Sequence, residues 1–513
     1  MPAPRPARRT VVWGGAIGLG LLIIYVGLTV AAWIYVRHVR HVEGVTYADI
    51  ALPSRWSHYE VLRGNHHIAV GLNLLAQGKL IPGFQQLRVG LARAPRHREG
   101  RLALAEIYAH TGRLDLAQTT LLDGLAFHAN DRDFVTATLE FLSAQIQDGK
   151  VLALCARLLA DPTLDPGIHQ LAALRSGQAS IFIGNYDQAE NTLRQNHLAD
   201  TPSGQLLMAQ IEWESGYQEL ALIMLRQLAA EFPADEAIYI RLADYLHKTN
   251  WDEELSRRAV LNQLAHPDSV RAYLDRLRAI DRRDGPAARQ KVVAETFTHF
   301  RDNASGLLAL ADYAATEGDI TLAERVAAQF SLHAWPDDRA ARLMVIEATL
   351  VAGDYAAALT RCQEFMGEPK LDPRHRQIAT GLQSIAFYGV GDPVAGYTNL
   401  ARLMTESDLR VESLSGIAKR LIAMGRAAPA REILAHAVKR DPRNQAALTR
   451  LIELDLDQHN LPAVAANLRH LVGMRRPSPD VLRRARIALG SDQCLFLPGR
   501  AEVLTLVQNI LAR

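Results

Sequence analysis

Cysteine is almost missing from this chain of 513 residues, which has three cysteines far apart from one another. Cys155, Cys362 and Cys494 form no C-x-x-C pair, so the sequence offers neither a disulfide framework nor a cysteine-based zinc site. We therefore expect three buried, unreactive thiols.

Aromatic residues are also scarce, at 6% of the chain, whereas alanine and leucine are abundant. Strands of β-sandwiches and barrels favour aromatic and β-branched residues, so this composition favours packed helices. An excess of charge of one sign is missing as well, because the formal net charge is +2. That balance gives no general attraction to nucleic acid, and we expect no nucleic-acid partner.

Motifs that carry catalysis are missing too. The sequence contains no phosphate-binding loop, dinucleotide-binding turn, H-E-x-x-H helix or G-x-S-x-G elbow. His38 and His41 are spaced to share a helix face, but no cysteine and few carboxylates stand near them. We therefore expect a protein that is not an enzyme and has no cofactor, metal or small-molecule substrate. An enzyme with a cryptic site remains an alternative.

One long uncharged run is present, over residues 11–36. A helix of this length would extend roughly 39 Å, and the hydrocarbon core of a bilayer is about 30 Å thick. Trp13 lies near one end, and Trp33 and Tyr35 lie near the other, as expected at two membrane interfaces. A cleaved signal peptide is the alternative, but the apolar run is longer than such peptides have. The sequence predicts one uncleaved transmembrane helix.

Basic residues flank this run. Arg5, Arg8 and Arg9 precede it, and Arg37 and Arg40 follow it, so positive charge is slightly higher on the N-terminal side. Positive charge is retained in the cytoplasm, which predicts that the rest of the chain is periplasmic. The chain has only seven lysines among its 57 basic residues, and such an arginine bias is typical of a GC-rich bacterial genome. We expect a single-pass inner-membrane protein of a bacterium.

A turn-forming residue recurs along most of the chain at a mean spacing of about 34.6 residues. Amphipathic helical patterns lie on both sides of each turn, and small residues stand seven before and five after most of them. The twelve predicted turn positions are Gly78, Gly112, Gly149, Gly184, Gly216, Asn250, Gly285, Gly318, Gly353, Gly391, Gly425 and His459.

This pattern resembles the tetratricopeptide repeat (TPR) family. The unit with Ala105, Tyr108, Gly112, Ala117 and Leu121 matches the family pattern best. The resemblance implies an all-α fold, namely a right-handed α-solenoid of about twelve helical hairpins after the transmembrane helix. The predicted segments are a basic tail (1–10), a transmembrane helix (11–36), a juxtamembrane linker (37–63), the solenoid (64–478) and a C-terminal helical cap (479–513).

The resemblance also implies a binding surface, because the first helix of each TPR hairpin lines a concave groove for partner peptides. The residue six before each turn should face that groove. The candidate partner-binding residues at this position are Glu106, Gln178, Gln210, Asp244, Asp312, Glu347 and Glu453. Five are carboxylates, which would form an acidic ladder that attracts a basic, extended protein segment. A row of solvated polar residues is the alternative interpretation.

These expectations combine into a membrane-anchored scaffold that binds other proteins and organises a membrane or cell-envelope complex. The alternative is an envelope-biogenesis regulator similar to the TPR proteins of lipopolysaccharide assembly. Those proteins end in a metal module with paired cysteines, whereas the C-terminal region of this chain has Cys494 alone.

Overall fold

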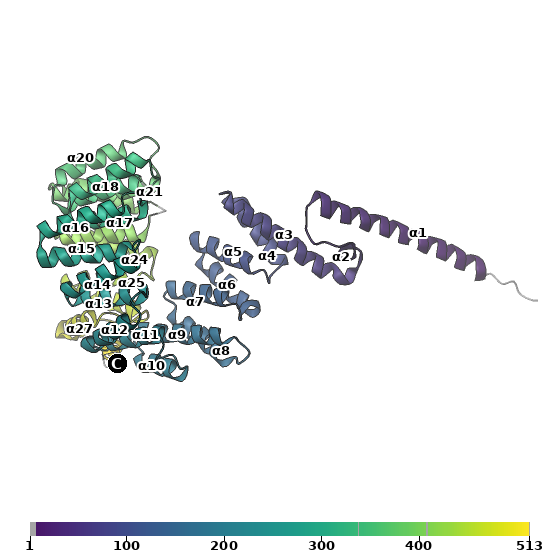
Figure 1. The fold of residues 1–513 in the computed structure, drawn as a ribbon, viewed down its shortest axis with the longest axis horizontal. Coiled ribbons are helices and arrows are strands. Elements are labelled where there is room, and N and C mark those ends of the chain that lie inside the picture. Colours follow the sequence, from purple (N-terminus) through teal and green to yellow (C-terminus); the bar gives the residue numbers. More distant parts are fainter. Residues whose placement is uncertain (1–6, 337, 407–408, 512–513) are drawn as a thin grey trace, which may run out of the picture. The chain divides into compact units, whose positions relative to one another are not determined.

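A computed structural model describes residues 7–336, 338–406 and 409–511 (Figure 1). The described residues form 28 α-helices and no strand. The predicted fold class, an α-solenoid of helical hairpins preceded by one apolar helix, is confirmed. The chain divides into two compact units, Met1–Arg175 (unit 1) and Ser176–Arg513 (unit 2), which are described separately.

Unit 1 begins with a long apolar helix and continues as helical hairpins. Two short helical elements, a π-helical turn at Tyr35–Val39 and a 3-10 turn at Pro53–Arg55, lie between the first three helices. The α-helices are α1 (Ala7–Ile34), α2 (Tyr47–Ala51), α3 (Trp56–Ala76), α4 (Leu80–Arg93), α5 (Arg98–His110), α6 (Leu114–His128), α7 (Arg132–Ala144) and α8 (Asp148–Ala160).

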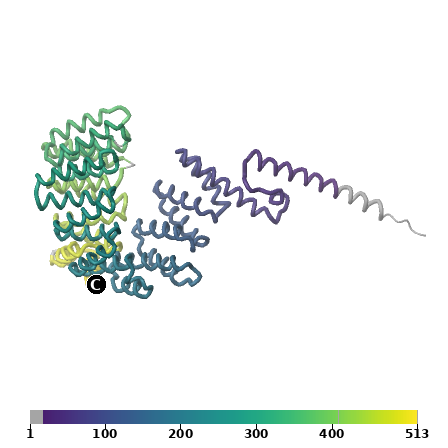
Figure 2. The backbone as a smooth tube through the Cα atoms, viewed as in Figure 1, coloured from purple at the N-terminus to yellow at the C-terminus, as the bar shows by residue number. Residues whose placement is uncertain are grey.

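Helix α9 (Pro166–Phe182) contains the boundary between the units. The remaining helices belong to unit 2 and follow one another as antiparallel hairpins (Figure 2). They are α10 (Tyr186–Gln195), α11 (Pro202–Glu214), α12 (Gln218–Glu231), α13 (Glu236–Lys248), α14 (Asp252–Ala265), α15 (Val270–Asp284), α16 (Pro286–His299), α17 (Ala304–Glu317), α18 (Ile320–His333), α19 (Asp338–Val351), α20 (Tyr355–Met366), α21 (Pro373–Gly389), α22 (Pro393–Met404), α23 (Val411–Ala423), α24 (Ala427–Arg440), α25 (Gln445–Asp457), α26 (Leu461–Val472), α27 (Pro479–Gly490) and α28 (Arg500–Leu511).

The turns within the hairpins explain the repeated glycines. Gly318 ends α17 in the left-handed conformation, with φ of 71°, which glycine adopts at little cost. The next residue, Asp319, accepts a hydrogen bond from the backbone N–H of Leu322 and caps the start of α18. One helix is thus stopped and the next is started within two residues.

Eleven of the twelve predicted turn residues have positive φ, and the exception is Gly149. Gly149 lies inside α8, and the turn residue of this hairpin is Ile146, with φ of 53°. The predicted turn at Gly149 is therefore wrong by three residues. The glycine misled the prediction because a β-branched residue is a poor candidate for positive φ. At Gly285 the position is right, but the turn is shorter, since α16 begins directly after it at Pro286.

Small residues allow the two helices of each hairpin to approach closely. In the first hairpin, a Cβ added to Gly71 would lie 3.0 Å from the carbonyl oxygen of Gly83, so no larger side chain fits between α3 and α4. Ala105 and Ala117 are buried at the corresponding places of the next hairpin. The repeated small residues are therefore packing positions.

The C-terminal helices cover the end of the repeat array. Leu482 and Val503, from α27 and α28, are fully buried in one cluster with Leu448 and Leu468 of the preceding hairpin. A solenoid needs such a cover because each repeat otherwise leaves an apolar face open.

Candidate binding surface

Five successive first helices form a continuous row in unit 2. Helices α15, α17, α19, α21 and α23 each contact the next first helix in this series, which leaves their free sides aligned along one surface. In unit 1, α5 contacts α3 and α7 in the same manner. We call the surface that the first helices form within each unit the inner face of that unit.

The seven residues predicted from the repeat register all lie on first helices, but their exposure differs. Glu106 lies in unit 1, and the other six lie in unit 2. Glu106 and Asp312 are exposed, whereas Gln210 is only 6% exposed. The partly buried members are Gln178, Asp244, Glu347 and Glu453.

Most of the predicted carboxylates have a basic neighbour. Three ion pairs are found among them: Asp244 with Arg271 at 2.5 Å, Glu347 with Arg420 at 2.5 Å and Glu453 with Arg450 at 2.8 Å. Glu106 lies 3.7 Å from the ring nitrogen of His110, which is charged only when protonated. Within the described part of the chain, Asp312 alone of the five has no such partner. The predicted positions therefore carry mixed charge, and Asp312 is the one predicted carboxylate without a basic partner among the described residues.

Arg271 organises the inner face at α13 and α15. Its Nη2 donates to Asp244 at 2.5 Å, and its Nε donates to Asp275 at 2.8 Å. Asp275 is 3% exposed and also accepts a hydrogen bond from the hydroxyl of Tyr239 at 3.1 Å. Burial, together with the charge of Asp275, raises the pKa of Tyr239, so this phenol stays a hydrogen-bond donor.

The Glu347–Arg420 pair joins two first helices that are not neighbours. Glu347 lies on α19 and Arg420 on α23, with α21 between them in the order of repeats. The equivalent inner position of α21 is Ile385, which is 1% exposed. Because Ile385 is apolar and buried, it does not compete for either charge, and the Glu347–Arg420 pair can extend across α21.

Gln210 behaves differently from the other candidates. Its Oε1 is buried and has no hydrogen-bond partner among the described residues. Nearby on α11, Trp213 stacks on Tyr245 of α13, with ring centroids 3.7 Å apart. Gln210 is therefore a packing residue of the first helices more than a contact for a partner.

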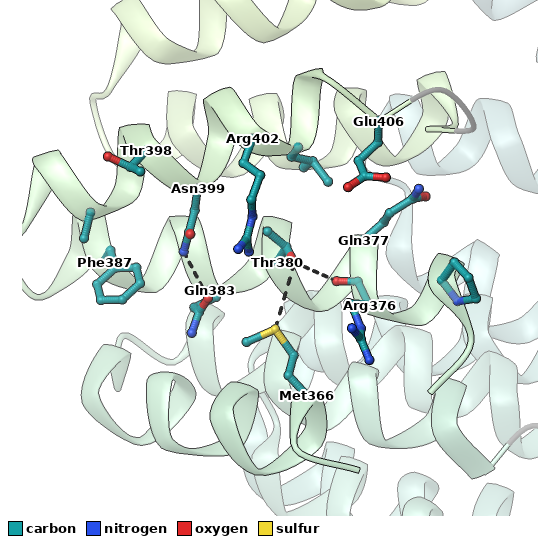
Figure 3. A pocket seen from close by; sticks show the side chains of 13 residues that line it. Met366, Arg376, Gln377, Thr380, Gln383, Phe387, Thr398, Asn399, Arg402 and Glu406 are labelled. Atoms are coloured by element: carbon teal, nitrogen blue, oxygen red, sulfur yellow. Dashed lines mark hydrogen bonds between the residues drawn. The ribbon is translucent and has the colours of Figure 1, made fainter. Parts of the chain in front are cut away.

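A pocket of about 810 Å³ opens on another side of α21, between α20, α21 and α22 (Figure 3). Arg402 extends from α22 toward α21, and Gln383 accepts a hydrogen bond from Asn399 at 3.0 Å. The lining residues are Met366, Pro373, Arg376, Gln377, Thr380, Gln383, Phe387, Ala395, Thr398, Asn399, Arg402, Leu403 and Glu406.

Reactive groups are not gathered anywhere in the described residues. No group of three or more His, Cys, Asp or Glu side chains that would hold a metal ion is found there. All three cysteines are buried, and burial raises the pKa of Cys155 and of Cys362 to about 12. These thiols are therefore protonated near neutral pH.

The N-terminal helix has a face covered by the chain itself. The hydroxyl of Tyr25 donates to the carbonyl of Ala51, the hydroxyl groups of Thr29 and Tyr47 lie 3.0 Å apart, and Trp33 Nε1 donates to the carbonyl of Val45 at 3.1 Å. Tyr25, Thr29 and Trp33 are spaced by four, so they form one stripe of α1. We call residues 42–52, which cover this stripe, the collar.

Helix α3 begins at Trp56, within the segment 37–63 that the sequence predicts as a juxtamembrane linker. Tyr59 and Leu62 of α3 pack against Val36, Val42 and Val45, and this contact favours the earlier helical start. Among the described residues, one helical stretch, Gly18–Val39, is long and apolar enough to cross a membrane. Arg5 of the predicted basic tail lies outside the described residues.

No family model matches the chain, and no curated protein matches it. Solved structures with similar chains include yeast Tom70 (11% identity, 86% of this chain and 99% of that chain, TM-score 0.33). Naa15/Naa10 bound to HypK-THB (14%, 93% and 78%, 0.29) and the APC/C hetero-tetramer Cut9-Hcn1 (12%, 89% and 97%, 0.25) are also similar. The fold is TPR-like. This conclusion rests on the hairpins of the chain, because TM-scores this low carry no argument about function.

The arginines of the inner face, and the α21–α22 pocket as a whole, were not predicted from the sequence. Arg420 directly follows Lys419, the residue counted as inward-facing in its repeat, so a margin of one residue would have included it. Arg271 lies near the start of its helix, far from the counted position. The sequence signal for the pocket is a set of differences between corresponding residues of the α19–α20 and α21–α22 hairpins.

Proposed function

We propose that the chain is a non-catalytic scaffold that binds extended segments of other proteins on its inner face and is anchored to a membrane by α1. The observation that carries this proposal is the aligned series of first helices in unit 2, with Asp312 exposed and unpaired among the described residues. A repeat array presents a long surface of this kind, and protein binding is its usual use.

The charges of the inner face support a basic partner segment. Asp244 and Glu347 are paired with Arg271 and Arg420, which hold the two carboxylates in position. A Lys or Arg of a partner segment would compete with these arginines for the same carboxylates. Asp312 offers a carboxylate without such competition. The proposed partner-binding residues remain Glu106, Gln178, Gln210, Asp244, Asp312, Glu347 and Glu453, of which Asp312 should contribute most and Gln210 least.

The proposed anchor uses the exposed apolar side of α1. Leu21, Leu22 and Ile23 are 57–63% exposed, which suits lipid contact. The collar is hydrogen-bonded to Tyr25, Thr29 and Trp33, so we place these residues at the membrane interface, where amphipathic aromatic side chains are stable. The collar would then set the depth of the helix. We further propose an inner membrane of a bacterium, with the solenoid in the periplasm and a cell-envelope complex as its partner.

The test is site-specific photocrosslinking in native membranes. A benzoylphenylalanine at Asp312 on α17 should crosslink partner proteins that a benzoylphenylalanine at Leu332 on α18 does not. Leu332 is the matched control because it is 72% exposed and lies on the second helix of the same hairpin. Equal crosslinking at both positions, or crosslinking at Leu332 alone, would contradict the assignment of the inner face.

A further inference from the structure

The pocket of α21 and α22 has a counterpart one repeat earlier. The turn residues Gly353 and Gly391 are 38 residues apart, so each residue of the α19–α20 hairpin corresponds to the residue 38 positions later. A second pocket lies between α18, α19 and α20, and it is lined by Arg342, Arg361, Glu364 and Glu368 among others. Their counterparts are Thr380, Asn399, Arg402 and Glu406, all of which line the α21–α22 pocket.

In the α19–α20 pocket, guanidinium groups are neutralised from within the chain. Arg342 pairs with Glu368 and, at 2.9 Å, with Asp338. Arg361 pairs with Glu324 at 2.6 Å. In this hairpin the arginines of the pocket are therefore paired with carboxylates of the chain itself.

In the α21–α22 pocket the pairs are broken by substitution. Thr380 replaces Arg342, while Arg376 replaces Asp338 and Arg402 replaces Glu364. Arg376 and Arg402 are exposed, and neither forms an ion pair with any described residue. Glu406 at the rim has lost the arginine that holds its counterpart. In place of internal ion pairs, the site therefore has two guanidinium groups without an ion-pair partner among the described residues.

The floor of this pocket also carries polar side chains. Gln383 is 9% exposed, and its Oε1 accepts a hydrogen bond from Asn399, so its amide N–H groups remain without a partner among the described residues. Thr380 is 5% exposed, and its hydroxyl donates to the Arg376 carbonyl at 2.8 Å (Figure 3). Arginine forks and amide N–H groups favour a carboxylate as ligand.

The remaining walls determine the size and character of the ligand. Met366, Phe387 and Leu403 give the pocket apolar sides, and about 810 Å³ lies within the range of pockets that hold whole ligands. A free small anion would leave these walls uncovered. A peptide segment with one carboxylate between apolar side chains satisfies both the donors and the walls.

We propose that the α21–α22 pocket binds an acidic peptide segment of a partner protein, with its carboxylate bound by Arg402 and its approach favoured by the positive charge of Arg376. This site is distinct from the inner face, because Gln383 and Ile385 are two residues apart and thus about 200° apart around α21. The chain would therefore bind basic segments on one side of this helix and acidic segments on another.

The test uses the full-length protein in detergent micelles and two pools of amidated hexapeptides. Both pools have Leu, Val, Phe or Ala at the flanking positions, and the central residue is Glu in one pool and Gln in the other. Equilibrium dialysis with mass spectrometry should show about tenfold stronger retention of the Glu pool, as one bidentate guanidinium–carboxylate contact provides. Equal retention of both pools would overturn the proposal.

Three variants connect this binding to the pocket. Arg402→Gln should abolish the preference for Glu, whereas Arg374→Gln, on α21 but outside the pocket lining, should keep it. Thr380→Arg restores the arginine of the preceding hairpin, so it should pair with Glu406, fill the pocket and abolish retention while the thermal midpoint is kept or raised. Unchanged retention by Thr380→Arg would overturn the proposal without affecting the inner-face assignment.

Inorganic phosphate distinguishes a small-anion site from a peptide site. At a concentration equal to that of the peptide pool, phosphate should displace little of the Glu pool, because it makes no contact with the apolar walls. Binding of phosphate that depends on Arg402, without retention of the Glu pool, would show a small-anion site and contradict the peptide ligand.

Discussion

The backbone N–H of Arg476 donates a hydrogen bond to the carbonyl oxygen of Phe182 at 2.7 Å, and this contact joins the last repeats of unit 2 to its first. The guanidinium of Arg475 lies 3.9 Å from the centroid of the Phe182 ring, and that of Arg476 lies 5.1 Å from the centroid of Tyr186. Unit 2 therefore returns to its own beginning, and the C-terminal helices lie near its first ones (Figure 2).

Gly184 tests this seam between the first and last repeats. Its φ is 79°, and a Cβ there would lie 2.7 Å from Cδ of Arg476. Gly184→Ala should therefore cost about 1 kcal/mol from backbone strain, and it should also loosen the seam. Gly353→Ala is the matched control, because φ is 84° and nothing lies within 4 Å of the added Cβ. Hydrogen exchange of peptides covering 473–478 should rise for Gly184→Ala alone, and equal exchange in both variants would argue against the seam.

Asp49 should make the collar sensitive to acid. The carboxylate is 1% exposed and accepts hydrogen bonds from the hydroxyl of Thr46 at 2.6 Å and from its backbone N–H at 2.9 Å, which lower the pKa of Asp49. Because the folded pKa lies below the ordinary value of 3.8, the stabilisation is complete above that value. It is lost as the pH falls through the folded pKa.

The readout for Asp49 is the fluorine NMR signal of 5-fluorotryptophan at Trp33, whose ring N–H is bound to Val45 in the collar. We expect the Trp33 signal of the full chain in micelles to shift below pH 4. Asp49→Asn should give a shifted signal already at neutral pH and no further acid transition. A normal titration in Asp49→Asn would show that another group controls the collar.

The three cysteines should be unreactive in the folded chain. Burial raises the pKa of Cys155 and of Cys362 to about 12, and Cys494 is 3% exposed. Ellman's reagent at pH 8 should therefore detect less than one thiol per chain in micelles and all three in 6 M guanidinium chloride. Rapid reaction of any thiol without denaturant would contradict the packing around that cysteine.

The side of the membrane that carries the solenoid remains a prediction of the arginine distribution. Alkaline phosphatase fused to the C-terminus should be active, and green fluorescent protein fused there should be dark, if the solenoid is periplasmic. Replacing Arg8 and Arg9 by Gln should increase the fraction of inverted molecules, because the charge difference across the helix is small. The opposite activity pattern in the unmodified fusions would place the solenoid in the cytoplasm.

The helical hairpins were largely predictable from sequence, because their signals are local. A glycine followed two residues later by a new amphipathic pattern defines a turn without knowledge of distant contacts. The prediction failed at Ile146, where the backbone adopts positive φ with a residue that does not favour it, and a nearby Gly149 offered a better local candidate.

The binding sites were less predictable. The register placed Asp312 and Glu347 on the correct helices but gave no information on their partners, since Arg420 is 73 residues from Glu347. Likewise, the α21–α22 pocket could not be predicted from the sequence. It exists because Thr380 is shorter than Arg342, the corresponding residue of the preceding hairpin, and this correspondence is meaningful only once both hairpins are seen in the folded structure.

The amino-acid sequence by itself determined that this chain forms helices of about 13 residues joined in hairpins, and that one apolar helix precedes them, because hydrophobic period and turn chemistry act over a few residues. The tertiary structure decided which carboxylates are paired, where a pocket opens, and that Arg476 meets Phe182. Such contacts depend on the small rotation between successive repeats, which accumulates along the array and is set by the packing of whole helices.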